Sequence, residues 1–238
     1  MTGEVSLKEG GSIQKGGWLP FSLLLLVAFL FLLPYLIVLP SGNAAVLYAL
    51  FDRHAEADIG PSRESELRNL SENLADYLFF KKDSAQILVQ GKPALNDDEL
   101  THLHDVRALY ALSGQTALFG CVLISGVLIF FFMKTKDVKK GIIRFLKCLQ
   151  KSGMMLTILF LLTALWALAD FTGIFHAFHQ ISFNNELWLL NPQKDLLIQL
   201  MPEPFFTDYL KRFALPWLLA PILFSLPLYR LIERKTER

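Results

Sequence analysis

WLPFSLLLLVAFLFLLPYLIVLP, residues 18–40, contains no charged side chain and is long enough to cross a membrane as a helix. A helix needs about 20 predominantly apolar residues to cross the hydrocarbon core of a bilayer. The apolar core of a cleavable signal sequence is shorter, at about 7–15 residues. The stretch therefore predicts a retained membrane anchor.

Three further apolar blocks of spanning length follow at 111–133, 154–172 and 213–232. The chain of 238 residues is 53% hydrophobic and contains 20 Phe, which excludes an ordinary soluble domain. Its formal net charge of +1 gives no support to nucleic-acid binding. The last block contains three prolines, which favours a helix packed against neighbours. The sequence thus predicts an all-α polytopic membrane protein with four transmembrane helices.

Basic residues indicate the orientation, because Lys and Arg accumulate in short cytoplasmic loops. Seven of them lie between the second and third spans, and further basic residues lie near both termini. We therefore expect both termini in the cytoplasm and a small extracytoplasmic domain built from two outer segments. The expected segments are a cytoplasmic N-terminus 1–17, spans 18–40, 111–133, 154–172 and 213–232, extracytoplasmic segments 41–110 and 173–212, a basic cytoplasmic loop 134–153, and a cytoplasmic tail 233–238.

The first outer segment contains recognisable helical patterns. Leucines at helical spacing predict a helix over 62–81, and 86–90 suits a short strand. Asn96 and Glu99 have the spacing of a reciprocal N-terminal cap, so a second helix begins there and runs into the second span. Residues 170–212, by contrast, read as a loop-rich insertion.

Four of the five histidines form two close pairs, His102/His104 and His176/His179, both in outer segments. On a helix His102 shares a face with Asp105, whereas His104 points roughly opposite. An imidazole has a pKa near 6.5 and carries protons at neutral pH, and a carboxylate partner fixes its tautomer. The pairs therefore indicate a site for acid/base chemistry.

Two other interpretations stay open from the residues alone. The four paired histidines offer up to four nitrogen ligands, as in a metal-binding sensor or hydrolase. Against that, His102 and His104 cannot both face one ion on a regular helix. The histidines also fit a non-catalytic membrane protein, where they only form hydrogen bonds at the interface. His54 is isolated and receives no role.

Two motifs carry a resemblance to a known family. ELTHLHDV at 99–106 and FHQISFNNELW at 178–188, followed by Asn191-Pro192, resemble the motifs of the bacterial lipoprotein intramolecular transacylases. The likeness covers nearly the whole chain, including the four expected spans. Departures lie at Leu103, Ser182 and Asn191, and none removes a candidate proton carrier.

The resemblance implies a membrane acyltransferase in the bacterial cytoplasmic membrane, with its active site on the extracytoplasmic side. Such an enzyme moves the sn-2 acyl chain of a lipoprotein's diacylglyceryl-cysteine to the α-amine of that cysteine, which gives the lyso-form. Its partners would be the diacylated lipoprotein N-terminus and membrane lipid, with no nucleic acid. Converting an ester to an amide is downhill, so no cofactor or metal is expected. The expected site residues are His102 and His179 as catalytic groups, with Asp105, His176, Asn184 and Asn185 in support.

Overall fold

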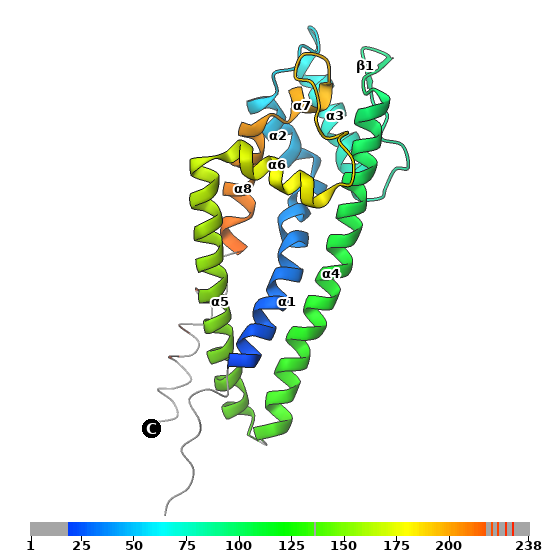
Figure 1. The fold of residues 1–238 in the computed structure, drawn as a ribbon. Helices are drawn as coiled ribbons and strands as arrows, with labels where there is room; N and C mark the ends of the chain where they lie inside the picture. Colours follow the sequence, from blue (N-terminus) through cyan, green and yellow to red (C-terminus); the bar gives the residue numbers. More distant parts are fainter. Residues whose placement is uncertain are drawn as a thin grey trace, which may run out of the picture.

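The computed structural model describes residues 19–135 and 137–217, together with 220, 223, 227 and 230. Within them, three helices are long and apolar enough to cross a membrane: α1 (Leu19–Val38, continued by the 3-10 turn η1, Leu39–Gly42), α4 (Asp97–Thr135) and α5 (Val138–Ala169). These helices run side by side along the molecule (Figure 1). The expected fourth span at 213–232 lies mostly outside the described residues, as do the expected termini 1–17 and 233–238.

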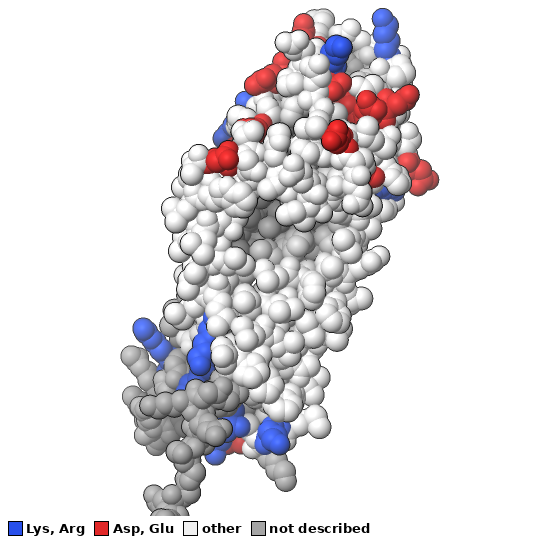
Figure 2. Space-filling model, viewed as in Figure 1, with Lys and Arg blue, Asp and Glu red and all other residues white. Residues whose placement is uncertain are grey.

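The three-helix bundle has the surface of a membrane protein. α1 packs along α4 and also contacts α5. Gly120 allows a close approach, because an added Cβ would lie 2.6 Å from the Ala28 carbonyl oxygen. Leu118 and Leu168 are 69% and 81% exposed, as suits lipid contact. Figure 2 shows a broad middle zone without charged side chains, with most Asp and Glu and some Lys and Arg at one end, and mainly Lys and Arg at the other.

The expected basic loop at 134–153 is mostly helical in the structure, which corrects that assignment. α4 continues to Thr135 and α5 begins at Val138, where the Asp137 carboxylate accepts a hydrogen bond of 3.1 Å from the Lys140 backbone amide. Residues 138–153 contain no proline, and Lys, Arg, Leu and Gln are good helix formers. The basic segment is therefore a short turn followed by four helical turns of α5.

The two outer segments pack into one unit at the end of the bundle where α4 begins (Figure 1). The first contributes α2 (Ala44–His54), α3 (Arg63–Leu78) and the antiparallel hairpin β1–β2 (Leu88–Val89 and Lys92–Pro93). The second contributes α6 (Phe171–Ser182), α7 (Leu196–Leu200) and α8 (Glu203–Phe213). Their shared core joins Phe51 and Leu67 to Leu197 and Phe205. The expected helix at 62–81 and the short strand are confirmed.

The expected reciprocal cap at the start of α4 is also confirmed. Asn96 Oδ1 accepts from the Glu99 amide at 3.0 Å, and Glu99 Oε2 accepts from the Asn96 amide at 2.9 Å. α4 has 39 residues, about 58 Å at 1.5 Å per residue, whereas a hydrocarbon core is about 30 Å thick. Its charged first section, 97–107, therefore extends beyond the membrane-spanning part into the outer unit.

The second outer segment is more helical than expected. α5 ends at Ala169, and the Asp170 carboxylate caps α6 by accepting from the Gly173 amide at 2.8 Å. α6 then lies across the end of the bundle (Figure 1). The helix of the third span ends at Ala169, before the expected end at 172, and His176 and His179 both lie on the separate helix α6.

Candidate active site

His102 and His179 come together although they lie in different outer segments. His102 is on the second turn of α4 and His179 is near the end of α6. Their ring centroids are 6.1 Å apart. Each residue is only 7% exposed. The structure thus brings together the two imidazoles that the sequence singled out.

His179 is held on several sides. Its Nδ1 lies 2.7 Å from the Phe175 carbonyl oxygen. Because a carbonyl oxygen only accepts, Nδ1 carries the proton in the neutral ring and Nε2 carries the lone pair. Trp188 stacks on the ring at 4.9 Å, and Phe175 packs against it at 4.1 Å. The tautomer and orientation of this imidazole are therefore fixed by its surroundings.

His102 lies in an apolar setting opposite His179. The Phe183 ring packs edge-on at 5.0 Å, and among the described residues no group forms a hydrogen bond with the buried His102 Nδ1. Burial lowers the His102 pKa from 6.5 to about 4, with a further decrease from His179 and a partial opposing effect from Asp105. Burial likewise lowers the His179 pKa, against the bond to Phe175. Both imidazoles are therefore neutral at neutral pH.

Asp105 connects α4 to the loop that covers the site. Its Oδ2 accepts a hydrogen bond of 2.8 Å from Asn185 Nδ2, and Asn185 Oδ1 accepts from the Leu187 amide at 3.0 Å. Within the described part of the chain, the expected hydrogen bond from an imidazole to Asp105 is not formed. His104 Nδ1 lies 3.9 Å from Asp105 Oδ1 with its side chain 77% exposed. Asp105 thus holds the loop rather than a catalytic ring.

The other two predicted residues lie at the margin of the site. His176 is exposed and packs edge-on at 5.2 Å against Trp188, the same ring that stacks on His179, and it contributes to the lowering of the His179 pKa. Asn184 is exposed in the loop after α6. Across residues 19–135 and 137–217, no three His, Cys, Asp or Glu side chains are grouped so that they could hold a metal ion.

The aromatic surroundings of the histidine pair were not assigned to the site from sequence. Trp188 and Phe183 are 8% and 7% exposed and cover the two imidazoles. The excess of aromatic residues in 175–188 was visible, but it suited an interfacial belt equally well. His54 also has a partner, because its Nε2 lies 3.0 Å from Asp208 Oδ2.

The outer face of α6 is apolar. Phe178 and Ile181 are 56% and 88% exposed, while His179 on the same helix is buried. α6 also follows directly on the membrane-spanning α5. An exposed apolar helix face beside a membrane span is typical of a helix lying in the lipid interface. This face of α6 is therefore suited to contact with lipid.

Comparisons with known proteins agree over most of the chain. The family model described as lipoprotein intramolecular transacylase Lit matches residues 22–206. Among curated proteins, no sequence matches the chain. The solved structure of the membrane integral lipoprotein intramolecular transacylase Lit from Bacillus cereus aligns with a TM-score of 0.72 at 19% identity, over 94% of this chain and 99% of that one.

Two structures of the same Bacillus cereus protein with one histidine replaced, by arginine or by alanine, also align. Each has a TM-score of 0.68 and 19% identity, and each alignment covers 92% of this chain. The alignments cover 93% and 95% of those chains. The fold described above is therefore the fold of that membrane protein.

Proposed function

The chain belongs to the lipoprotein intramolecular transacylase family, and from this premise we propose the chemistry that its histidine pair performs. The substrate is a lipoprotein whose N-terminal cysteine carries a thioether-linked diacylglyceryl group and a free α-amine. The enzyme transfers the sn-2 acyl chain from the glycerol oxygen to that amine. The single observation that carries this proposal is the pair of buried, neutral imidazoles 6.1 Å apart on α4 and α6.

His179 is the base. With Nδ1 bound to the Phe175 carbonyl oxygen, its Nε2 lone pair is available to take a proton from the attacking amine. The amine nitrogen forms a bond to the ester carbonyl carbon as that proton leaves. A depressed pKa keeps His179 unprotonated, and therefore basic, at neutral pH.

His102 is the acid that completes the transfer. When the carbonyl carbon releases the sn-2 oxygen, that oxygen needs one proton. This proton balances the one that His179 has taken from the amine. His102 faces His179 across the site and relays that proton: it takes the proton from His179 on one ring nitrogen as it gives its own ring N–H to the leaving oxygen. Neither imidazole becomes an anion, and the enzyme ends as it began. No cofactor enters this balance.

The supporting residues position the reactants. Asp105 and Asn185 hold the loop over the histidines through their 2.8 Å hydrogen bond. Asn184 is the proposed donor to the developing oxyanion. Amine and ester belong to one molecule, so holding them in contact supplies a large part of the rate enhancement. The apolar face of α6 keeps the reacting ester at the level of the outer lipid interface.

Mass spectrometry of a lipoprotein's N-terminal peptide tests this function. Bacterial membranes that contain diacylglyceryl lipoprotein and this enzyme should give the N-acyl, S-monoacylglyceryl form. His102→Ala and His179→Ala should each abolish that product. His104→Ala is the matched control, because His104 lies on the same helix but is exposed, and this variant should remain active.

Two results would contradict the proposed function. Near-normal product from both His102→Ala and His179→Ala, with wild-type amounts of protein in the membrane, would refute the two-histidine mechanism. Loss of product on adding a metal chelator to the wild-type enzyme would refute the proposal that no metal takes part.

A further inference from the structure

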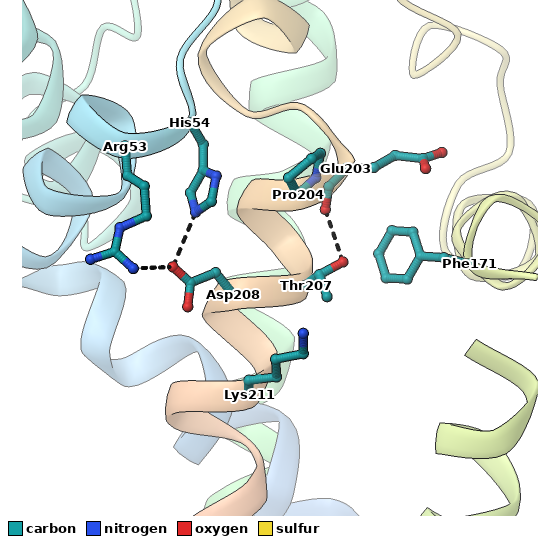
Figure 3. A pocket seen from close by; sticks show the side chains of 8 residues that line it. All are labelled: Arg53, His54, Phe171, Glu203, Pro204, Thr207, Asp208 and Lys211. Atoms are coloured by element: carbon teal, nitrogen blue, oxygen red, sulfur yellow. Dashed lines mark hydrogen bonds and ion pairs between the residues drawn. The ribbon is translucent and has the colours of Figure 1, made fainter. Parts of the chain in front are cut away.

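A pocket of about 520 Å³ lies between α2, the start of α6 and α8, apart from the two catalytic histidines (Figure 3). Arg53 and His54 come from the end of α2, and Lys211 from the last turn of α8. Phe171 and Pro204 add apolar surface to its wall. Phe171 lies 6.2 Å from Phe175, which packs on His179, so the pocket and the active site share an aromatic wall.

Two basic side chains, Arg53 and Lys211, and two carboxylates, Glu203 and Asp208, line the pocket, and Arg212 beside it pairs with Asp208. Asp208 Oδ2 binds His54 at 3.0 Å and Arg53 at 3.4 Å, while its Oδ1 accepts from Arg212 at 2.7 Å. One carboxylate is thus shared by two guanidinium groups. These bonds, first that to Arg212 and then that to His54, lower the Asp208 pKa to about 2, so it stays ionised.

The remaining carboxylate and ammonium groups of the pocket differ in their pairing. Glu203 accepts a hydrogen bond of 2.9 Å from the Thr172 hydroxyl. In Figure 3 its side chain extends away from that of Lys211. Lys211 has no hydrogen bond or ion pair with any residue that the structure describes. The pocket therefore offers one unneutralised ammonium beside a guanidinium that is only weakly paired.

The pocket lies at the level of lipid headgroups. Phe171 follows two residues after the end of the membrane-spanning α5 at Ala169. On the last turn of α5, Trp166 is 51% and Leu168 81% exposed, as is typical of side chains in contact with lipid at the interface. An unpaired ammonium beside an apolar wall at this level is complementary to a phosphodiester joined to acyl chains.

We propose that this pocket binds the headgroup of an anionic phospholipid. Lys211 and Arg53 contact the phosphodiester, and Phe171 and Pro204 lie against the glycerol. The lipoprotein substrate has no phosphate, because its glycerol is joined to cysteine sulfur. The bound phospholipid is therefore a second lipid, distinct from the molecule that the histidines act on.

Native mass spectrometry of the purified full-length protein with added phosphatidylglycerol tests the site. Lys211→Gln and Arg53→Gln should each weaken binding about fivefold, the effect of one basic residue at a membrane surface. Lys211→Arg keeps the charge and should keep the binding. Lys92→Gln is the matched control, because it removes the same charge from an exposed position on the β hairpin.

Two outcomes would overturn the proposal. One is equal weakening by Lys211→Gln and Lys92→Gln, which would mean diffuse attraction to the whole outer unit. The other is full displacement of the lipid by inorganic phosphate at equal concentration, which would mean a site for a free anion. Lys211 is exposed and has no described partner, so its replacement leaves the fold intact. Lyso-lipoprotein formation should be unchanged in Lys211→Gln, which separates this test from that of the transacylase chemistry.

Discussion

At the scale of single residues, the site depends on two imidazoles whose surroundings differ. His179 has a hydrogen-bonded Nδ1 and an aromatic ring on each of several sides, so its tautomer is fixed. His102 is buried and lies beside another imidazole, and both effects disfavour its protonated form. A buried ionisable group with a shifted pKa is costly unless it has a use, and the proposed proton transfer would provide one.

The His102 pKa predicts a pH dependence of stability. The folded-state pKa is about 4 and the ordinary value is 6.5, so below pH 6.5 the unfolded chain binds more protons at this position. The stability from neutral His102 is therefore fully present above pH 6.5 and is lost as the pH falls to about 4. Thermal unfolding in detergent should show a smaller loss between pH 7 and pH 4 for His102→Gln than for the wild type.

His104→Gln is the control for this measurement, because that imidazole is exposed. It should lose as much stability as the wild type over the same pH range. His179 contributes with the same sign, since its pKa is also lowered, so some loss remains in His102→Gln. Identical pH curves for His102→Gln and the wild type would mean that the folded pKa of His102 is not depressed.

At the scale of elements, local sequence signals predicted the helices better than the connections. The cap at Asn96 and Glu99 needs only residues three apart, and it fixed the start of α4 correctly. The cap of α6 at Asp170 was equally local but was not predicted, because the polar, proline-containing residues of 170–212 suggested a loop-rich insertion. The packing of Trp188 on His179 was not predictable, since it depends on how the loop after α6 folds back.

Glu99 connects the start of α4 to α7, a contact that the sequence did not predict. Its carboxylate is almost fully buried and accepts from the Leu197 amide at 2.7 Å as well as from Asn96. Burial raises the Glu99 pKa, and these backbone bonds oppose the rise. Glu99→Ala leaves two backbone amides without an acceptor, at a cost of about 2 kcal/mol.

We therefore expect Glu99→Ala to lower the thermal unfolding midpoint in detergent clearly, and Glu72→Ala, at an exposed position on α3, to leave it unchanged. Since Leu197 lies in the first turn of α7, just after the covering loop, the loss should also increase proteolysis of residues 183–195. If Glu99→Ala and Glu72→Ala unfold at the same temperature, the buried carboxylate does not hold α4 and α7 together.

At the scale of the whole molecule, the chain separates a membrane bundle from a polar unit that contains the histidine pair. The bundle leaves apolar side chains exposed over its middle zone, and the charges lie at its two ends (Figure 2). The site forms where α4 leaves the bundle and α6 turns across it, so each histidine comes from a different outer segment. Hydropathy predicted the three described spans, but only the folded chain shows that the segments between them share one core.

The orientation of this bundle is a prediction that single cysteines test. With Cys121 and Cys148 replaced by alanine, we expect Lys92→Cys on the β hairpin to react with a membrane-impermeant maleimide in intact bacteria. Lys140→Cys, at the start of α5, should react only after the membrane is permeabilised. The basis is the excess of Lys and Arg around the α4–α5 turn, which predicts a cytoplasmic location for it.

Both engineered cysteines replace exposed lysines, so a difference in labelling reports sidedness rather than burial. Lyso-lipoprotein formation by each variant shows that it is folded. Labelling of Lys140→Cys in intact cells, with Lys92→Cys protected, would show that the topology is the reverse of the predicted one. The histidine pair would then face the cytoplasm, where lipoproteins still carry their signal sequences and lack the free α-amine that the proposed reaction requires.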